Sequence, residues 1–152
     1  MSKKDTKDLI KFLNPFPDNV KEITLWLREF IWLLYPSCNE LIYDNYNALA
    51  ITFSLTDKAS DAFCGVAVYS KYVNFGFNRG SEITDSEKIL SGKGSLYRYI
   101  TVKEKKDFPE AFIKNLLKEA YTNALARFKE SKQTIKGQTI TKLILPVKRR
   151  PK

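Results

Sequence analysis

The stretch from Ala62 to Val102 constrains the fold most, because three runs rich in β-branched and aromatic residues follow one another between glycine-bearing turns. Runs of this composition between turn signals are typical of sheet strands. We expect strands at residues 62–70, 72–77 and 96–102. The first run is apolar at nearly every position, which predicts a central strand rather than an edge strand.

Two long amphipathic helices are predicted on either side of these strands. Apolar residues recur at three- and four-residue spacings in residues 18–35 and again in residues 112–128. Asp107 and Glu110 form a capping signature before the second helix. We expect residues 1–13 to form a short helix or a loosely docked arm.

Further strands are expected at residues 39–44 and 46–55, joined by a tight turn near Asn45, and at residues 139–147, an edge strand that tolerates a proline. One face of the strand expected at residues 46–55 has only small residues, which suits a close-lying helix more often than a ligand. Thr84 and Glu87 resemble a capping box and predict one helical turn that ends at Gly92.

These elements predict one α+β domain over residues 1–152, with N- and C-terminal helices packed on one face of a curved antiparallel sheet. Residues 129–152 form a basic, β-like C-terminal segment of this domain.

The net charge of +9 is concentrated at the C-terminus. Residues 129–152 have eight basic residues and one acidic residue, so the rest of the chain has a charge of only +2. The same segment lacks Phe, Tyr and Trp, and therefore offers phosphate attraction without base stacking. We expect a weak contact with polyanions through the last cationic residues. We do not expect a dedicated binding surface for single-stranded nucleic acid. These cationic residues are Lys148, Arg149, Arg150 and Lys152.

The composition excludes several chemistries. The chain has no histidine, which removes the usual Ser-His and Cys-His nucleophiles and histidine metal sites. Cys38 and Cys64 form no CxxC motif and indicate free thiols in a reducing cytosol. No apolar run is long enough for a leader or a membrane span. We expect no catalytic residues, no cofactor, no bound metal and no membrane partner.

Arg98 is the candidate binding residue. A two-residue period places it on the same strand face as Ile100 and Val102, where a charge needs a partner or access to water. It either forms a structural ion pair, extends to solvent or recognises an anionic ligand. The carboxylates considered as internal partners are Glu40, Asp44, Glu82 and Asp85.

Two further groups of candidate site residues accompany Arg98. Gly92 and Gly94 flank a lysine in a turn, but a phosphate loop normally leads into a helix and this turn leads into a strand. A set of aromatic residues is interpreted as core and rim packing, although a tyrosine-lined pocket near Arg98 would look the same: Trp26, Trp32, Tyr43, Tyr46, Tyr69 and Tyr72. Asn45, in the turn beside Tyr43 and Tyr46, joins them as a candidate site residue.

Several motifs are similar to those of the YdhG-like domain family, the domain-of-unknown-function family numbered 1801. The matching residues are Glu-Leu-Ile-Tyr-Asp-Asn-Tyr-Asn-Ala at 40–48, Val-Asn-Phe-Gly-Phe at 73–77, Gly80, Asp85, Gly92, Gly94, Arg98, Ile100 and the basic tail from Gly137 to Lys152. The chain departs from one branch of the family at Thr84 and Ser86, which replace prolines, and at Ser95, which replaces a lysine.

The resemblance implies a bacterial, intracellular domain with a frataxin-like curved sheet and no agreed activity. Some members are thought to be frataxin-like iron chaperones, which would require an acidic ridge. Here Asp18, Glu22 and Glu29 alternate with Lys21 and Arg28.

The leading hypothesis is therefore a non-enzymatic cytoplasmic binding domain. Its small anionic ligand or partner peptide would lie at the Arg98 side of the sheet, with Tyr43, Asn45, Tyr46, Gly92 and Gly94. The alternatives are an iron chaperone and a weak electrostatic nucleic-acid binder that uses the basic C-terminal segment.

Overall fold

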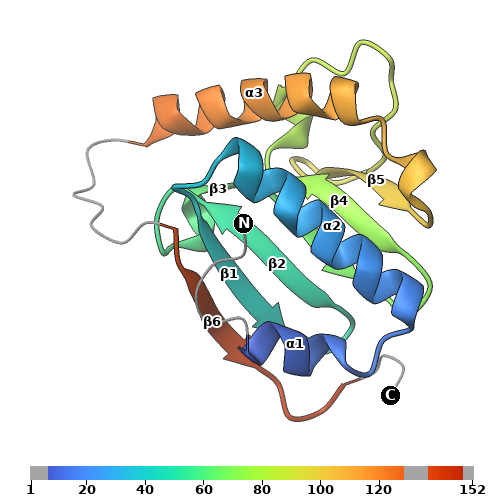
Figure 1. Ribbon diagram of the computed structural model, residues 1–152. Helices are drawn as coiled ribbons and strands as arrows, with labels where there is room; N and C mark the ends of the chain where they lie inside the picture. The colour runs from blue at the N-terminus through green and yellow to red at the C-terminus, as the bar shows by residue number, and fades with distance from the viewer. Residues whose placement is uncertain (1–6, 129–136, 149–152) are drawn as a thin grey trace.

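The computed structural model describes residues 7–128 and 137–148 (Figure 1). Its helices are α1 (Lys7–Leu13), α2 (Asp18–Leu34) and α3 (Glu110–Arg127). Its strands are β1 (Asn39–Asp44), β2 (Leu49–Ser54), β3 (Ala62–Val68), β4 (Val73–Phe77), β5 (Arg98–Val102) and β6 (Thr139–Ile144). Short 3-10 turns are η1 (Ala59–Asp61), η2 (Gly80–Glu82) and η3 (Lys105–Asp107).

The described strands form one sheet in the order β5-β4-β3-β2-β1-β6, which confirms the α+β class and the central position of β3. The neighbouring pairs from β1 to β5 are antiparallel, as predicted, but β6 is parallel to β1. The sheet is therefore mixed. The cause is the place where β6 begins. The backbone N–H of Gly137 donates to Ser37 O, and the backbone N–H of Glu40 donates to Gln138 O, so β6 starts beside the start of β1.

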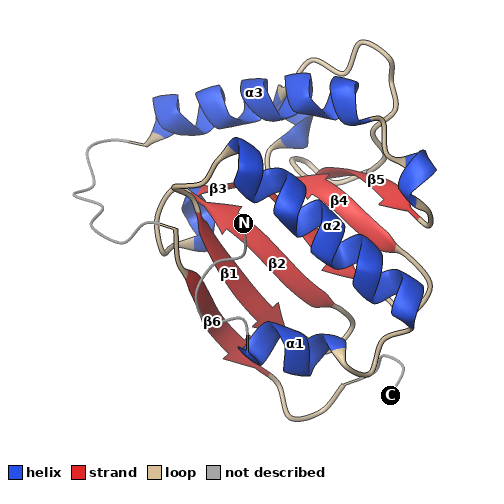
Figure 2. Ribbon diagram, viewed as in Figure 1, coloured by secondary structure: helices blue, strands red, loops and turns tan. Residues whose placement is uncertain are grey.

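The helices lie on one face of the sheet, with α2 running diagonally across its middle strands (Figure 2). Alternate strand residues point toward them and are buried. Phe30 of α2, Phe75 of β4 and Phe108 before α3 meet edge to face, with ring centroids 5.1 to 6.5 Å apart. Within the described ranges, no helix combines the length and apolarity needed to cross a membrane.

The predicted helical turn after Thr84 is wrong. Residues 84–92 contain turns and one bridge residue instead. Thr84 donates its N–H and hydroxyl to the Glu119 carboxylate on α3, while the Asp85 carboxylate accepts from the backbone N–H groups of Ile89 and Leu90. These tertiary and local bonds use the groups that a capping box needs.

Asp107 also caps a different element from the one predicted. It forms a capping box with Glu104 around the 3-10 turn η3, and α3 begins at Glu110 after Pro109.

Candidate functional site

A hollow face of the sheet is the most distinctive surface of the molecule. Strand registers place small or uncharged residues on the face away from the helices, and no described helix covers them. The prediction that a close-lying helix covers the small face of β2 is therefore wrong. The facing residues of β1 to β5 include Leu41, Tyr43, Ala50, Thr52, Gly65, Ala67, Asn74, Gly76, Tyr99 and Thr101.

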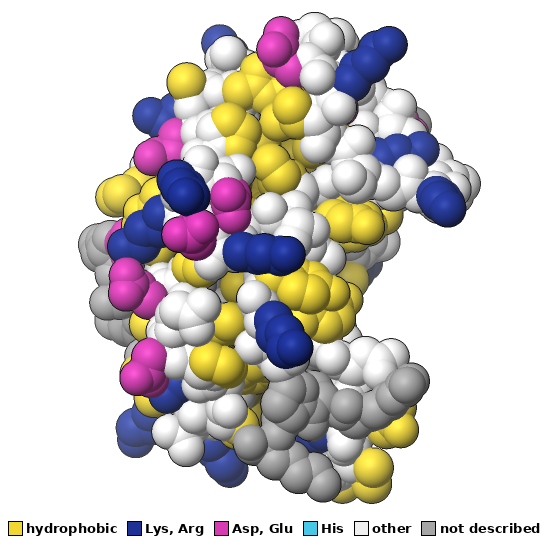
Figure 3. All heavy atoms as spheres, turned by 90° about the vertical axis from the view of Figure 1, so that its right-hand side faces the viewer, with side chains coloured by type: hydrophobic (Ala, Val, Ile, Leu, Met, Phe, Trp, Pro, Cys, Tyr) yellow, Lys and Arg dark blue, Asp and Glu magenta, His cyan; other side chains and the backbone are white. Residues whose placement is uncertain are grey.

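Gly65 is required for the close packing of the backbone at this face. A Cβ atom at Gly65 would lie 2.5 Å from Ile51 O and 3.0 Å from Thr52 Cα, both of them backbone atoms on β2. In Figure 3 the outline of the molecule is concave on the right, the side away from the helices, and hydrophobic ring side chains lie at the upper border of this hollow. Most acidic side chains visible in this view lie on the left, away from the hollow, and one lies at the top.

Four tyrosines gather on this face, and we call them the tyrosine cluster: Tyr69, Tyr72, Tyr97 and Tyr99. Tyr69 and Tyr72 close the β3–β4 turn and stack with their ring centroids 5.1 Å apart. Tyr97 and Tyr99 stack at 5.8 Å with an angle of 22° between their ring planes. Burial raises the pKa of Tyr69, and the nearby phenols of Tyr72 and Tyr99 add to this shift, which makes the two pairs neighbours.

Tyr97 lies over Gly76, where a Cβ atom would be only 2.1 Å from its hydroxyl oxygen. The residue is 42% exposed, yet its hydroxyl end is the part that rests on the sheet. Burial of that end, together with Tyr69 and Tyr99, raises the pKa of Tyr97 to about 12. The hydroxyl therefore stays protonated at neutral pH and remains a hydrogen-bond donor.

Arg98 lies on the predicted face, opposite Phe77 and in line with Ile100 and Val102. Its Nη1 donates to Gly94 O and Tyr97 O, each at 2.7 Å, and its stem packs against Gly80 and Gly92. Gly92 has a φ of +136°, which places this loop close to the arginine at a conformation that favours glycine. Arg98 thus closes the loop of residues 91–97, which carries Tyr97.

Of the alternatives considered for Arg98, the internal ion pair does not form, because each carboxylate considered has other partners. Glu40 binds Arg28 and Thr139, Asp44 contacts Lys148, Glu82 binds Arg79, and Asp85 accepts from Ile89 and Leu90. The backbone carbonyls of the 91–97 loop satisfy Arg98 locally instead.

We expect Arg98→Ala to loosen the 91–97 loop while the core remains intact. Loss of two partly exposed hydrogen bonds lowers the free energy of unfolding by about 1–2 kcal/mol. Hydrogen exchange should accelerate in residues 91–97 and remain unchanged in β2 and β3. Uniform acceleration across the sheet would contradict a local role.

The predicted site residues separate into two groups. Gly92 and Gly94 lie with Arg98 at the β5 edge, whereas Tyr43, Asn45 and Tyr46 lie at the end of β1. Four strand spacings separate β5 from β1, or about 19 Å. Tyr43 faces the hollow, but Arg98 is on the helix side of the sheet, so these residues do not form one site.

A buried ion pair joins α2 to β1. Arg28 Nε lies 2.6 Å from Glu40 Oε2, and Thr139 of β6 donates its hydroxyl to Glu40 Oε1 at 2.8 Å. The Arg28 guanidinium lies 4.6 Å from the centroid of Trp32, and its Nη2 has no hydrogen-bond partner among the described residues. Burial raises the pKa of Glu40, although Arg28 and Thr139 oppose that shift. This cluster holds three elements together.

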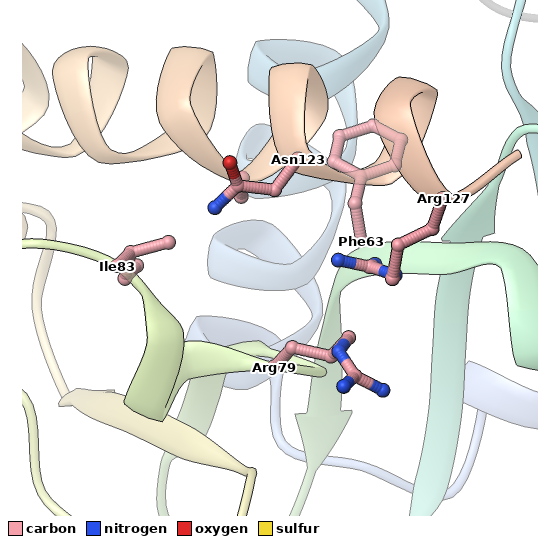
Figure 4. A pocket seen from close by; sticks show the side chains of 6 residues that line it. Phe63, Arg79, Ile83, Asn123 and Arg127 are labelled. Carbon is pink, nitrogen blue, oxygen red and sulfur yellow. The ribbon is translucent and has the colours of Figure 1, made fainter.

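A small hollow lies between η2 and the end of α3 (Figure 4). Arg79 and Arg127 point into it, with Phe63, Ile83, Ala120 and Asn123 as the other lining residues. Glu82 binds Arg79 in a bidentate pair at 3.0 and 2.7 Å and lies 3.7 Å from Arg127 Nη1. The Arg79 bond holds the pKa of Glu82 below its usual range, while burial and then Arg79 lower the pKa of Arg127. An internal carboxylate therefore already takes the place of an anion here.

Metal and thiol chemistry have little local support. Within residues 7–128 and 137–148, no group of three carboxylate or thiol side chains is placed to hold a metal ion. Cys38 and Cys64 are buried, and burial raises the pKa of Cys64 well above its usual value.

In the C-terminal segment, Lys148 contacts Asp44, with Nζ 3.2 Å from Oδ2. Arg149, Arg150 and Lys152 lie outside the described residues.

Sequence reasoning missed Tyr97 and Tyr99. It followed the apolar face of the strand at residues 96–102 and singled out Arg98, whereas the other face of the same strand carries Tyr97, Tyr99 and Thr101. The two-residue period contains this signal. The proximity of Tyr69 and Tyr72 does not appear in the sequence, because it depends on the pairing of β3, β4 and β5.

No family model, curated protein or solved structure matches this chain.

Proposed function

We propose that this protein is a non-catalytic binding domain, and that its hollow sheet face holds a ligand with flat rings through the tyrosine cluster. The observation that carries the proposal is the two stacked tyrosine pairs on a face that no described helix covers. Exposed ring faces attract flat unsaturated groups, and the phenol hydroxyls supply polar contacts. The role proposed for Arg98 is to position the loop that carries Tyr97.

We also propose membership of the YdhG-like domain family. The string Tyr-Asp-Asn-Tyr-Asn at residues 43–47 supports this assignment, together with the Val-Asn-Phe-Gly-Phe strand. The α+β class and the sheet face that no described helix covers are compatible with the frataxin-like architecture that the family implies.

Thermal shift of the full chain with uncharged nucleosides tests the binding proposal. A ligand at a hundred times its Kd stabilises the folded state by about 2.7 kcal/mol, which is easily measured. We expect at least one nucleoside to raise the Tm, Tyr99→Phe to keep the shift, and Tyr99→Leu to remove it. Tyr46→Leu is the matched control, because Tyr46 is exposed but lies outside the tyrosine cluster. Equal shifts in the wild type and in Tyr99→Leu would refute this site.

A further inference from the structure

We propose that the ring-bearing ligand is single-stranded nucleic acid, whose bases stack on the tyrosine cluster while its phosphates follow a basic end of the sheet. This inference rests on the proposed function and adds the class of ligand. The basic tail lacks aromatic residues, but the fold supplies them on a separate surface of the same basic chain.

The tyrosine cluster has the extent that stacking on successive bases requires. Its two ring pairs are contributed by three neighbouring strands or their turns, with Tyr97 and Tyr99 on β5 and its preceding loop, and Tyr69 and Tyr72 at the β3–β4 turn. Tyr69, Tyr72 and Tyr99 are half-buried and Tyr97 is exposed, so the rings are held in place yet accessible. Stacking of this kind depends little on the base sequence of the ligand, because every base has a flat face.

The hollow face has no charge that repels a polyanion. Among the described residues of β1 to β5 that face the hollow, none is Asp, Glu, Lys or Arg, so no carboxylate repels phosphate there. The chain as a whole has a net charge of +9, which attracts nucleic acid over a distance.

Basic side chains collect at one end of the sheet. Val68, Val73 and Val102 are paired in one row there. Exposed Lys71 lies in the turn between Tyr69 and Tyr72, and exposed Lys103 follows Val102. Lys148 lies at the β1 side of the same row, but Asp44 already neutralises it there. Phosphates that follow bases on the tyrosine cluster would therefore reach Lys71 and Lys103.

Polar groups between the rings can contact base edges. Asn74 Oδ1 accepts a hydrogen bond from the Thr101 hydroxyl at 2.7 Å, which leaves the Asn74 amide N–H groups for a ligand. Single strands expose the base edges that such amides bind, whereas a duplex hides its base faces. The site should therefore prefer single strands.

Fluorescence anisotropy with labelled ten-nucleotide single strands and the full chain tests this inference. Tyr99→Leu should weaken binding about 5- to 150-fold, and Tyr99→Phe should change it less than about twofold. Tyr72→Leu is a second test at the exposed turn, in case Tyr99→Leu does not fold. Lys71→Ser should reduce the slope of log K against log salt by about 0.7, the value for one phosphate contact on a single strand. Lys114→Ser, an exposed lysine on α3, should leave that slope unchanged.

The outcomes separate this inference from the proposed function. If nucleosides stabilise the protein but oligonucleotides bind no more tightly than nucleosides, the inference of a nucleic-acid ligand is refuted, while the proposed stacking site is retained. Failure of both would overturn both. Oligonucleotide binding that survives Tyr99→Leu and Tyr72→Leu but disappears on deletion of residues 148–152 would assign it to the tail alone. Equal affinity for a duplex of the same length would also overturn the inference.

Discussion

Arg28→Met is expected to lower the free energy of unfolding by about 3–5 kcal/mol, although the side-chain volume hardly changes. The reason is that Glu40 is completely buried and would lose its only cationic partner among the described residues. A buried carboxylate without a cation costs far more than the net energy of the ion pair. Urea denaturation of the wild type and the variant measures the difference.

Two controls isolate the charge effect. Arg28→Met combined with Glu40→Leu removes both charges together and should recover most of the lost stability, because apolar replacements of buried pairs are often neutral or better. Arg79→Ala removes an exposed pair with Glu82 and should cost far less stability than Arg28→Met, because solvent screens exposed ion pairs. A loss below 1 kcal/mol for Arg28→Met would show that the Glu40 carboxyl is not held as a buried charge.

Much of the fold was accessible from local patterns. The sequence predicts β1, β2, α2 and α3 to within a few residues, because the spacing of apolar residues and the positions of turn residues are local signals. The parallel addition of β6 was not predicted. It depends on Glu40 and Asn39, which bind residues about a hundred positions later along the chain. No local pattern encodes that pairing.

The two arginines show the same limit for site residues. Arg98 is a candidate in the sequence because it is a charged residue on an apolar strand face, but nearby backbone carbonyls accept its hydrogen bonds. In the sequence, Arg28 stands out only as a basic residue that alternates with the helix carboxylates. Its burial depends on Glu40 and Trp32 together, and only the folded chain shows which of its neighbours are within reach.

Gly65→Ala is expected to be the most damaging single-methyl addition in the described sheet and to lower the free energy of unfolding by about 3 kcal/mol. The added Cβ atom would lie 2.5 Å from Ile51 O and 3.0 Å from Thr52 Cα. Both atoms belong to a paired strand and cannot rotate away, so β2 and β3 would have to separate or flatten. Thermal and urea denaturation measure the loss.

Two other glycines provide matched comparisons for this substitution. Gly94→Ala should be nearly neutral, because nothing lies within 4 Å of the added atom. The three atoms nearest to a Cβ added at Gly76 all belong to the Tyr97 phenol, which can rotate away from the sheet. The cost of Gly76→Ala in stability should therefore be smaller than that of Gly65→Ala, while stacking of ligands on the displaced Tyr97 should weaken. Equal stability of the Gly65 and Gly94 variants would mean that the sheet relaxes freely at Gly65, and that the close backbone approach does not maintain the hollow.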